Sequence, residues 1–143
     1  MGVRVKGADK IKAKLAKMSD KYNDPKLTQK MGILAVQMVA ERTQDGKDMH
    51  DRKFKSYTSA YSNKRTKTGR GTKVDLTDKG NMLAAMTYRS KKGSVVIFFR
   101  GADENLKAHG HHNGISKHGV PARPFFGLTK GEESRIMKLI KDS

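Results

Sequence analysis

The chain has 143 residues, of which 31 are Lys or Arg and 14 are Asp or Glu, so its formal net charge is +17. This length fits one domain with a modest core, and the absence of cysteine excludes disulfides and thiolate metal sites. The longest apolar run, residues 32–40, is far shorter than the roughly 20 residues that span a bilayer, and the N-terminus lacks a signal-peptide block. We therefore expect one soluble domain over residues 1–143, made in a reducing cytoplasm, with no membrane partner.

The first third of the chain predicts two helices. Residues 8–22 have the spacing of an amphipathic helix and follow a weak strand pattern at residues 3–6. Asp24 and Pro25 predict a helix start, because a carboxylate caps the free amides and proline suits the first helical position. This helix should run to about Thr43. Its middle is apolar almost all round, so we expect it at the centre of the fold, or between the core and a neighbouring subunit.

Residues 44–75 lose this periodicity and predict an extended basic loop or arm. Between Arg52 and Val74 there are eight basic residues and no acidic one. Tyr57 and Tyr61 have helical spacing, which predicts a short helix inside the arm, whereas residues 64–73 predict a disordered tip. Such a charge favours nucleic acid or an acidic protein face, although a solvated surface has the same composition.

The remaining residues predict a hairpin between helices. A short helix is expected over residues 77–86, strands over 86–90 and 94–100, and a helical turn over 102–108. The second strand is apolar on both faces, so it should be central or covered on both sides. Thr129 and Glu132 form a capping-box pattern that starts a C-terminal helix over 129–141. The fold class is therefore α+β: a small, mostly antiparallel sheet packed by two or three helices, with a long basic loop or arm.

The segment from Lys107 to Leu128 contains four histidines, four glycines, two prolines and two adjacent phenylalanines. Glycine permits left-handed backbone and proline favours extended backbone, so we expect a rigid, shaped connector that anchors the last helix. In extended backbone, Phe125 and Phe126 would face opposite ways, with one in the core and the other elsewhere. The alternative is that both hold the C-terminal helix.

Catalytic and metal-binding patterns do not emerge from this sequence. The histidines, among them His109 and His111, have no cysteine to join them as ligands and few Asp or Glu residues nearby. The carboxylates are scattered, no nucleophile elbow occurs, and Gly69–Lys73 lacks the spacing of a phosphate-binding P-loop. We therefore expect no metal, no cofactor and no enzymatic activity.

Three segments resemble, in the same order, motifs of the tail-completion or virion-morphogenesis family of tailed bacteriophages. Residues 76–82 (LTDKGNM) are similar to its "(R)TG-x-L" helix start, and residues 106–114 (LKAHGHHNG) to its "YA-x-x-HQFG" segment. Residues 120–128 (VPARPFFGL) are similar to its "(I)PARPFLGL" signature, which is the most specific of the three. Here Asp78 replaces the glycine of the first motif, and the tyrosine of the second is missing. The likeness covers roughly residues 27–140.

The resemblance implies a non-enzymatic structural virion protein with an α+β fold. Such proteins form rings in the phage neck that complete or terminate the tail, or join it to the head connector, around the DNA channel. The expected partners are copies of the chain in a homo-oligomeric ring, sixfold or twelvefold, the neighbouring connector and tail proteins, and double-stranded DNA in the channel. Assembly would take place in the cytoplasm of the bacterial host. The alternative is a basic nucleic-acid-binding protein that grips phosphates through residues 52–73.

The candidates for assembly contacts are aromatic, basic and histidine residues of the arm and of the 107–128 segment. They are Phe54, Tyr57, Tyr61, Lys64, Arg65, Lys67, Arg70, Lys73, His109, His111, Arg123, Phe125 and Phe126.

Overall fold

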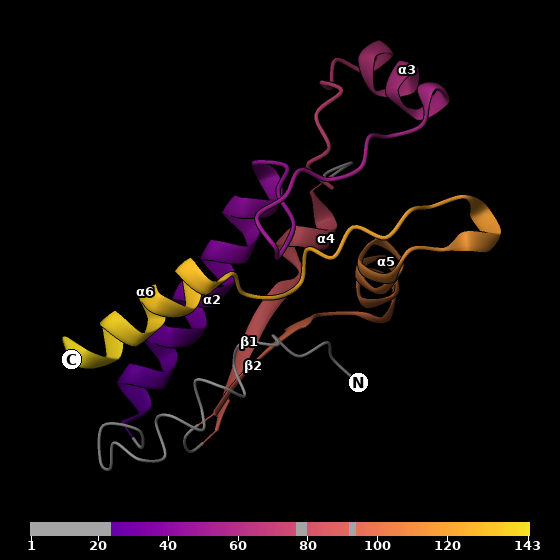
Figure 1. Ribbon diagram of the computed structural model, residues 1–143. Coiled ribbons are helices and arrows are strands. Elements are labelled where there is room, and N and C mark those ends of the chain that lie inside the picture. The colour runs from indigo at the N-terminus through magenta and orange to yellow at the C-terminus, as the bar shows by residue number, and fades with distance from the viewer. Residues whose placement is uncertain (1–23, 77–79, 92–93) are drawn as a thin grey trace.

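The computed structural model describes residues 24–76, 80–91 and 94–143, and within them it has the predicted α+β fold (Figure 1). The predicted strand at residues 3–6, the helix at 8–22 and the start of the 77–86 helix lie outside the described residues. The described elements are α2 (Pro25–Gln44), α3 (Ser59–Lys67), α4 (Asn81–Ala84), β1 (Met86–Lys91), β2 (Ser94–Phe99), α5 (Ala102–Asn113), the 3-10 turn η2 (Ser116–His118) and α6 (Lys130–Lys141). No helix in these ranges has both the length and the apolar character that crossing a membrane requires.

Helix α2 lies at the centre of the fold, as its apolar composition predicts. It begins where expected: the Asp24 side chain accepts a hydrogen bond from the Lys26 amide at 3.0 Å, and Pro25 takes the first helical position. One side of α2 packs against the β1–β2 hairpin and another against α6 (Figure 1). Ile33, however, remains 51% exposed, so the apolar surface of the helix is not covered all round.

Strands β1 and β2 form the predicted antiparallel hairpin, with Met86 opposite Phe99 and Tyr88 opposite Ile97. Ile97 and Phe99 are buried on one face, whereas Phe98 on the other is half-buried, with the Arg89 guanidinium 5.0 Å from its ring centre. Of the two expectations for the second strand, central or covered on both sides, a central position is not found in the described part of the chain, where the sheet has two strands. The second apolar face of β2, which carries Phe98, is partly covered by the Arg89 guanidinium of β1.

A glycine brings the hairpin close to α2. A Cβ atom built on Gly32 would lie 2.3 Å from Cδ2 of the Tyr88 ring, closer than any side chain can approach. The missing side chain therefore lets the aromatic ring of β1 lie directly on the helix backbone.

Helix α6 begins with the predicted capping box. Glu132 N donates to the Thr129 hydroxyl at 3.1 Å, and Thr129 N donates to the Glu132 carboxylate at 2.9 Å. Ile136 and Ile140 are buried, so an amphipathic face packs this helix onto α2. The C-terminal helix predicted over residues 129–141 is thus confirmed.

Phe125 and Phe126 both enter the core and are 0% and 1% exposed. Their ring centres lie 6.0 Å apart, and Phe99 lies 6.0 Å from Phe125 and 5.0 Å from Phe126. The expectation that one of them faces elsewhere is wrong. The chain bends at Phe126 and Gly127, so the strict alternation of an extended backbone does not apply.

Helix α5 is longer than the predicted turn over residues 102–108. It continues to Asn113, so the first part of the 107–128 segment is helical and not an extended connector. Gly110 lies inside this helix, and a Cβ there would come within 2.9 Å of Ile115 Cδ1. The loop that follows α5 therefore packs over Gly110. This contact offsets the roughly 1 kcal/mol that a glycine costs inside a helix relative to alanine.

Candidate functional site

Four candidate residues, Tyr57, Tyr61, Arg65 and Arg123, come together at the base of α3, and we call them the tyrosine–arginine cluster. The two tyrosine rings meet edge to face, with centres 4.8 Å apart. The Arg65 guanidinium carbon lies 5.1 Å from the centre of the Tyr57 ring, and that of Arg123 lies 5.0 Å from the same ring. One tyrosine therefore contacts two cations, which the electron-rich ring faces favour.

The Arg65 side chain forms the central contacts of the arm. Its side chain is buried, and Nε donates to the Gly71 carbonyl at 2.8 Å while Nη2 lies 3.3 Å from the Asp75 carboxylate. Leu76 N donates to the Tyr57 hydroxyl at 3.2 Å. The prediction of a disordered tip at residues 64–73 is therefore wrong: the chain forms the last turn of α3 and then wraps around one guanidinium.

The two tyrosines do not share a helix as their spacing suggested. Helix α3 begins at Ser59, and Thr58 caps it by accepting a hydrogen bond from Tyr61 N at 3.3 Å. Tyr57 precedes the extended cap residue Thr58, and its ring lies against the guanidinium groups of Arg65 and Arg123. Burial raises the pKa of the Tyr57 hydroxyl, which the nearby Arg65 charge partly opposes, so the phenol stays neutral.

Arg123 joins the arm to the proline-rich segment. Its Nε donates to the Lys55 carbonyl at 2.9 Å, and its Nη2 donates to the Ser56 carbonyl at 3.0 Å, although these residues are 68 and 67 positions away. Burial lowers the pKa of this guanidinium. Because both acceptors are backbone carbonyls, the contact depends on the fold of the arm and not on the identity of its side chains.

The histidines of α5 have separate environments. His109 is exposed beside Asn113, whereas His112 Nδ1 accepts a hydrogen bond from Phe126 N at 3.2 Å. His111 Nδ1 is buried without a hydrogen-bond partner among the described residues, and burial, followed by the charge of Arg123, lowers its pKa. Within the described ranges, no three His, Asp or Glu side chains are grouped so that they could hold a metal ion.

The other candidates divide between the interior and the surface. Phe54 is buried in the same core as the phenylalanine pair, whereas Lys64, Lys67 and Lys73 are exposed and Arg70 is half-buried. The lysine candidates are thus all exposed, whereas the aromatic and arginine candidates are buried or half-buried.

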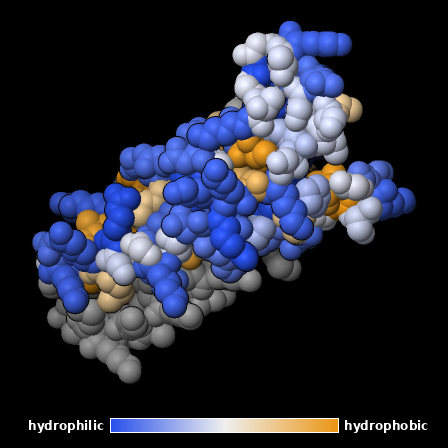
Figure 2. Space-filling view, turned by 45° about the horizontal axis from the view of Figure 1, so that its top comes forward, coloured by the Kyte–Doolittle hydropathy of each residue, from blue (hydrophilic) through white to orange (hydrophobic). Residues whose placement is uncertain are grey.

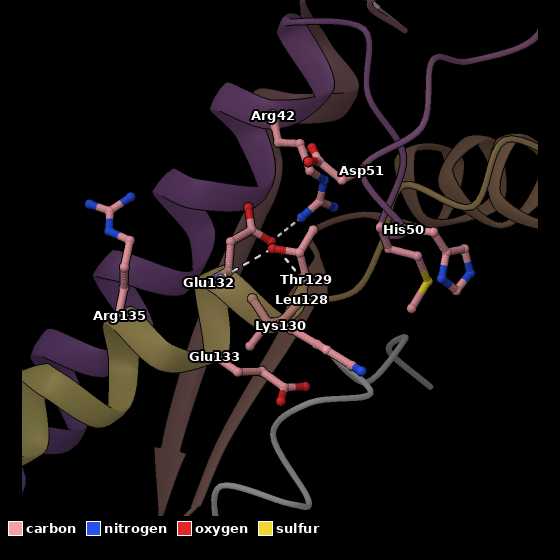
Figure 3. A pocket seen from close by; sticks show the side chains of 11 residues that line it. Arg42, His50, Asp51, Leu128, Thr129, Lys130, Glu132, Glu133 and Arg135 are labelled. Carbon is pink, nitrogen blue, oxygen red and sulfur yellow. Dashed lines mark hydrogen bonds and ion pairs between the residues drawn. The ribbon is translucent and has the colours of Figure 1, made fainter.

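The sequence did not point to Arg42, which holds a second cluster at the joint between α2 and α6 (Figure 3). Its guanidinium donates to the Glu132 carboxylate and to the carbonyls of Phe125 and Gly127, the last at 3.0 Å. Burial lowers the pKa of Arg42, and the Glu132 charge opposes this effect. The available signal was an arginine that closely follows the apolar middle of a helix.

A pocket of about 920 Å³ opens beside this joint, and Figure 3 shows Arg42 and Glu132 turned toward each other while Arg135 points away. The guanidinium and the carboxylate are therefore already paired, and they serve the helix joint. A smaller pocket, of about 430 Å³, is lined by residues of the arm, of α4 and of α5: Tyr61, Leu76, Gly80, Asn81, Met82, Lys107 and His111.

Comparisons of the chain with protein-family models, with curated proteins and with solved structures find no match. The likeness to phage tail-completion proteins therefore rests on the three motif segments. In the structure these segments are neighbours: residues of 76–82 and 106–114 line the smaller pocket, and Arg123 N donates to the His111 carbonyl at 2.7 Å.

Proposed function

We propose that this chain is a structural protein of a tailed-phage neck, which completes or terminates the tail, or joins it to the head connector, as a ring around the DNA channel. The observation that supports this most directly is the meeting of the three motif segments around the base of the arm. Segments that are separate in the sequence but adjacent in the fold favour one shared role over three accidental likenesses.

The arrangement of the arm fits an assembly role. The arm is anchored by buried arginine contacts, yet α3 projects beyond the helices and hairpin that form the body (Figure 1). A closed ring of identical subunits uses two different faces of each copy, and a rigid projection offers one of them. Proteins of this kind act by shape, and the proposed role includes no catalysis.

Two measurements test the proposal. Negative-stain electron microscopy of the purified protein, alone and with tail or connector preparations, should show closed rings. Labelled chain in virions should appear between head and tail. A protein that stays monomeric with these partners and is missing from purified particles would contradict the proposal.

A further inference from the structure

The arm has an unusual set of exposed cations. Its lysines at positions 53, 55, 64, 67 and 73 are all exposed, and none forms an ion pair with a carboxylate in the part of the chain that the structure describes. The acidic groups nearby are already engaged, because Asp75 faces Arg65 and Asp48 faces Arg52. Like charges gathered in this way repel one another, so the fold alone does not account for them.

The chemistry of the exposed surface distinguishes between two kinds of partner. Protein interfaces are enriched in aromatic residues and arginine and depleted in lysine and serine. At the base of this arm, Arg65 and Arg123 both contact the Tyr57 ring and donate to the chain's own carbonyls. The exposed residues of the arm are mainly lysines and hydroxyl side chains, the latter including Ser59, Thr66, Thr68 and Thr72, together with Arg52 at the start of the basic stretch.

Helix α3 supports the same distinction. Of its nine residues only Arg65 is buried, so the helix has no apolar face to place against a protein. Lys64 and Lys67 are one turn apart and share a face. Figure 2 shows hydrophilic and weakly hydrophilic residues over most of this projection, with the strongly hydrophobic residues below it.

We infer that the exposed lysines of the arm bind the phosphates of double-stranded DNA without sequence preference. Lysine is a mobile point charge that needs no fixed geometry at a phosphate, whereas Arg65 and Arg123 use their planar guanidinium groups for contacts within the fold. The inference rests on the proposed function for the identity of the DNA, which is the duplex that passes through the neck. Each arm contributes a few weak contacts, and a ring of arms multiplies them.

The test measures binding of the full chain to a short fluorescent duplex of mixed sequence over a series of salt concentrations. The arm variant carries Lys55→Gln, Lys64→Gln, Lys67→Gln and Lys73→Gln. The matched control carries Lys26→Gln, Lys30→Gln, Lys138→Gln and Lys141→Gln, which remove the same charge from exposed positions on α2 and α6. A third variant replaces the same four arm lysines by arginine, and circular dichroism checks that all three fold.

The slope of log affinity against log salt becomes shallower by about 0.9 for each phosphate that the protein no longer neutralises. The arm variant should therefore reduce this slope by roughly 3 to 4 and bind at least about tenfold more weakly at low salt. The control should reduce the slope by less than about 1, and the arginine variant should bind like the unmodified chain. Equal reductions in the arm variant and the control, or an unchanged arm variant, would overturn the inference. So would an arm variant that keeps its DNA affinity and fails only to bind connector or tail proteins.

Ring formation, measured on the same samples, separates this inference from the proposed function. Rings that persist in the arm variant while DNA binding disappears support both. An unmodified chain that binds DNA through the arm but forms no rings contradicts the neck proposal and supports phosphate binding by the arm. Rings without arm-dependent DNA binding overturn the inference alone.

Discussion

Arg42 on α2 donates to Glu132 on α6, and this buried pair joins two helices whose paired residues lie 90 positions apart in the chain. The same carboxylate oxygen of Glu132 accepts the Thr129 amide that closes the capping box. The start of α6 and its attachment to α2 therefore depend on one oxygen atom. Removing either partner leaves a buried charge without its counterpart, which costs much more than the intact pair contributes.

Replacing the cation at this joint should weaken the fold strongly. Arg42→Met is expected to lower the free energy of unfolding by roughly 3–5 kcal/mol, because Glu132 and two carbonyls lose their donor. Urea unfolding measures the change. Arg135→Met, at an exposed position of α6, is the control and should stay within about 0.5 kcal/mol. A decrease below about 1 kcal/mol for Arg42→Met would contradict this role.

The phenylalanine pair should also contribute strongly to stability. Phe125→Ala and Phe126→Ala are each expected to cost roughly 3–5 kcal/mol, since both rings are fully buried and leave cavities against Phe99. Thermal and urea unfolding of each variant provide the measurement. If either variant is destabilised by less than about 1 kcal/mol and still assembles, that residue is not an anchor.

Two helical glycines should respond in opposite directions to alanine. Gly32→Ala is expected to destabilise the protein by roughly 1–2 kcal/mol, because the new methyl group meets the Tyr88 ring and this overpacking outweighs the gain in helix propensity. Gly131→Ala in α6 meets nothing closer than 3.9 Å and should be neutral or stabilising by up to about 1 kcal/mol. Unfolding midpoints compare the two. A Gly32→Ala variant at least as stable as the unmodified chain would show that Tyr88 moves aside freely.

The hydrogen bonds of Arg65 should protect the arm from proteolysis. The Arg65→Ala variant lacks the guanidinium and therefore loses the hydrogen bonds to Gly71 and Asp75. A hydrogen bond that involves a charged group contributes roughly 1.5–3 kcal/mol to stability. Trypsin should then cleave after Lys67 and Lys73 about ten to a hundred times faster, in proportion to local opening. Lys64→Ala, an exposed neighbour, serves as the control and should leave both rates unchanged. Equal rates in the two variants would show that the arm does not depend on Arg65.

His111 should make the fold sensitive to mild acid. Its pKa is lowered in the folded protein from the ordinary value of 6.5, so above 6.5 both states are neutral and the residue has no effect on stability. As the pH falls below 6.5, the unfolded chain binds a proton that the folded chain resists, and stability decreases until the lower folded pKa is reached. The decrease is at most about 1.4 kcal/mol per pH unit, and partial exposure reduces it.

The matching variant is His111→Gln, with the exposed His118→Gln as control. The free energy of unfolding is measured at pH 7.5 and 5.5 for all three proteins. The stability of the His111→Gln variant should decrease less between these values than that of the other two. An identical decrease in all three would contradict the assignment.

Much of the fold follows from local sequence signals. The starts of α2 and α6 are predicted to within one residue, because a helix cap is determined by neighbours such as Asp24 with Pro25 and Thr129 with Glu132. The hairpin follows from two β-rich stretches separated by a short turn. In each case the deciding residues are contiguous.

The two clusters depend on distant partners. The sequence therefore predicted the members of the tyrosine–arginine cluster but not their arrangement, and it did not predict the role of Arg42. Arg123 is fixed by carbonyls 67 and 68 positions away and Arg42 by a carboxylate 90 positions away. Both lie in local patterns that suit an exposed cation equally well. The length of α5 was missed for a related reason. Ile115 contacts Gly110 only because the chain folds back over the helix after α5 ends.

Arg123 and Phe125 are two residues apart, and they hold different parts of the molecule. The Arg123 side chain donates a hydrogen bond to the backbone at the root of the arm. The Phe125 carbonyl accepts a hydrogen bond from Arg42 in the centre of the body. The short stretch from Arg123 to Phe125 thus connects the root of the arm to the α2–α6 joint, in addition to the covalent path from the arm into α2. Tension applied to α3 by a neighbouring molecule would therefore reach buried hydrogen bonds in the interior of the protein.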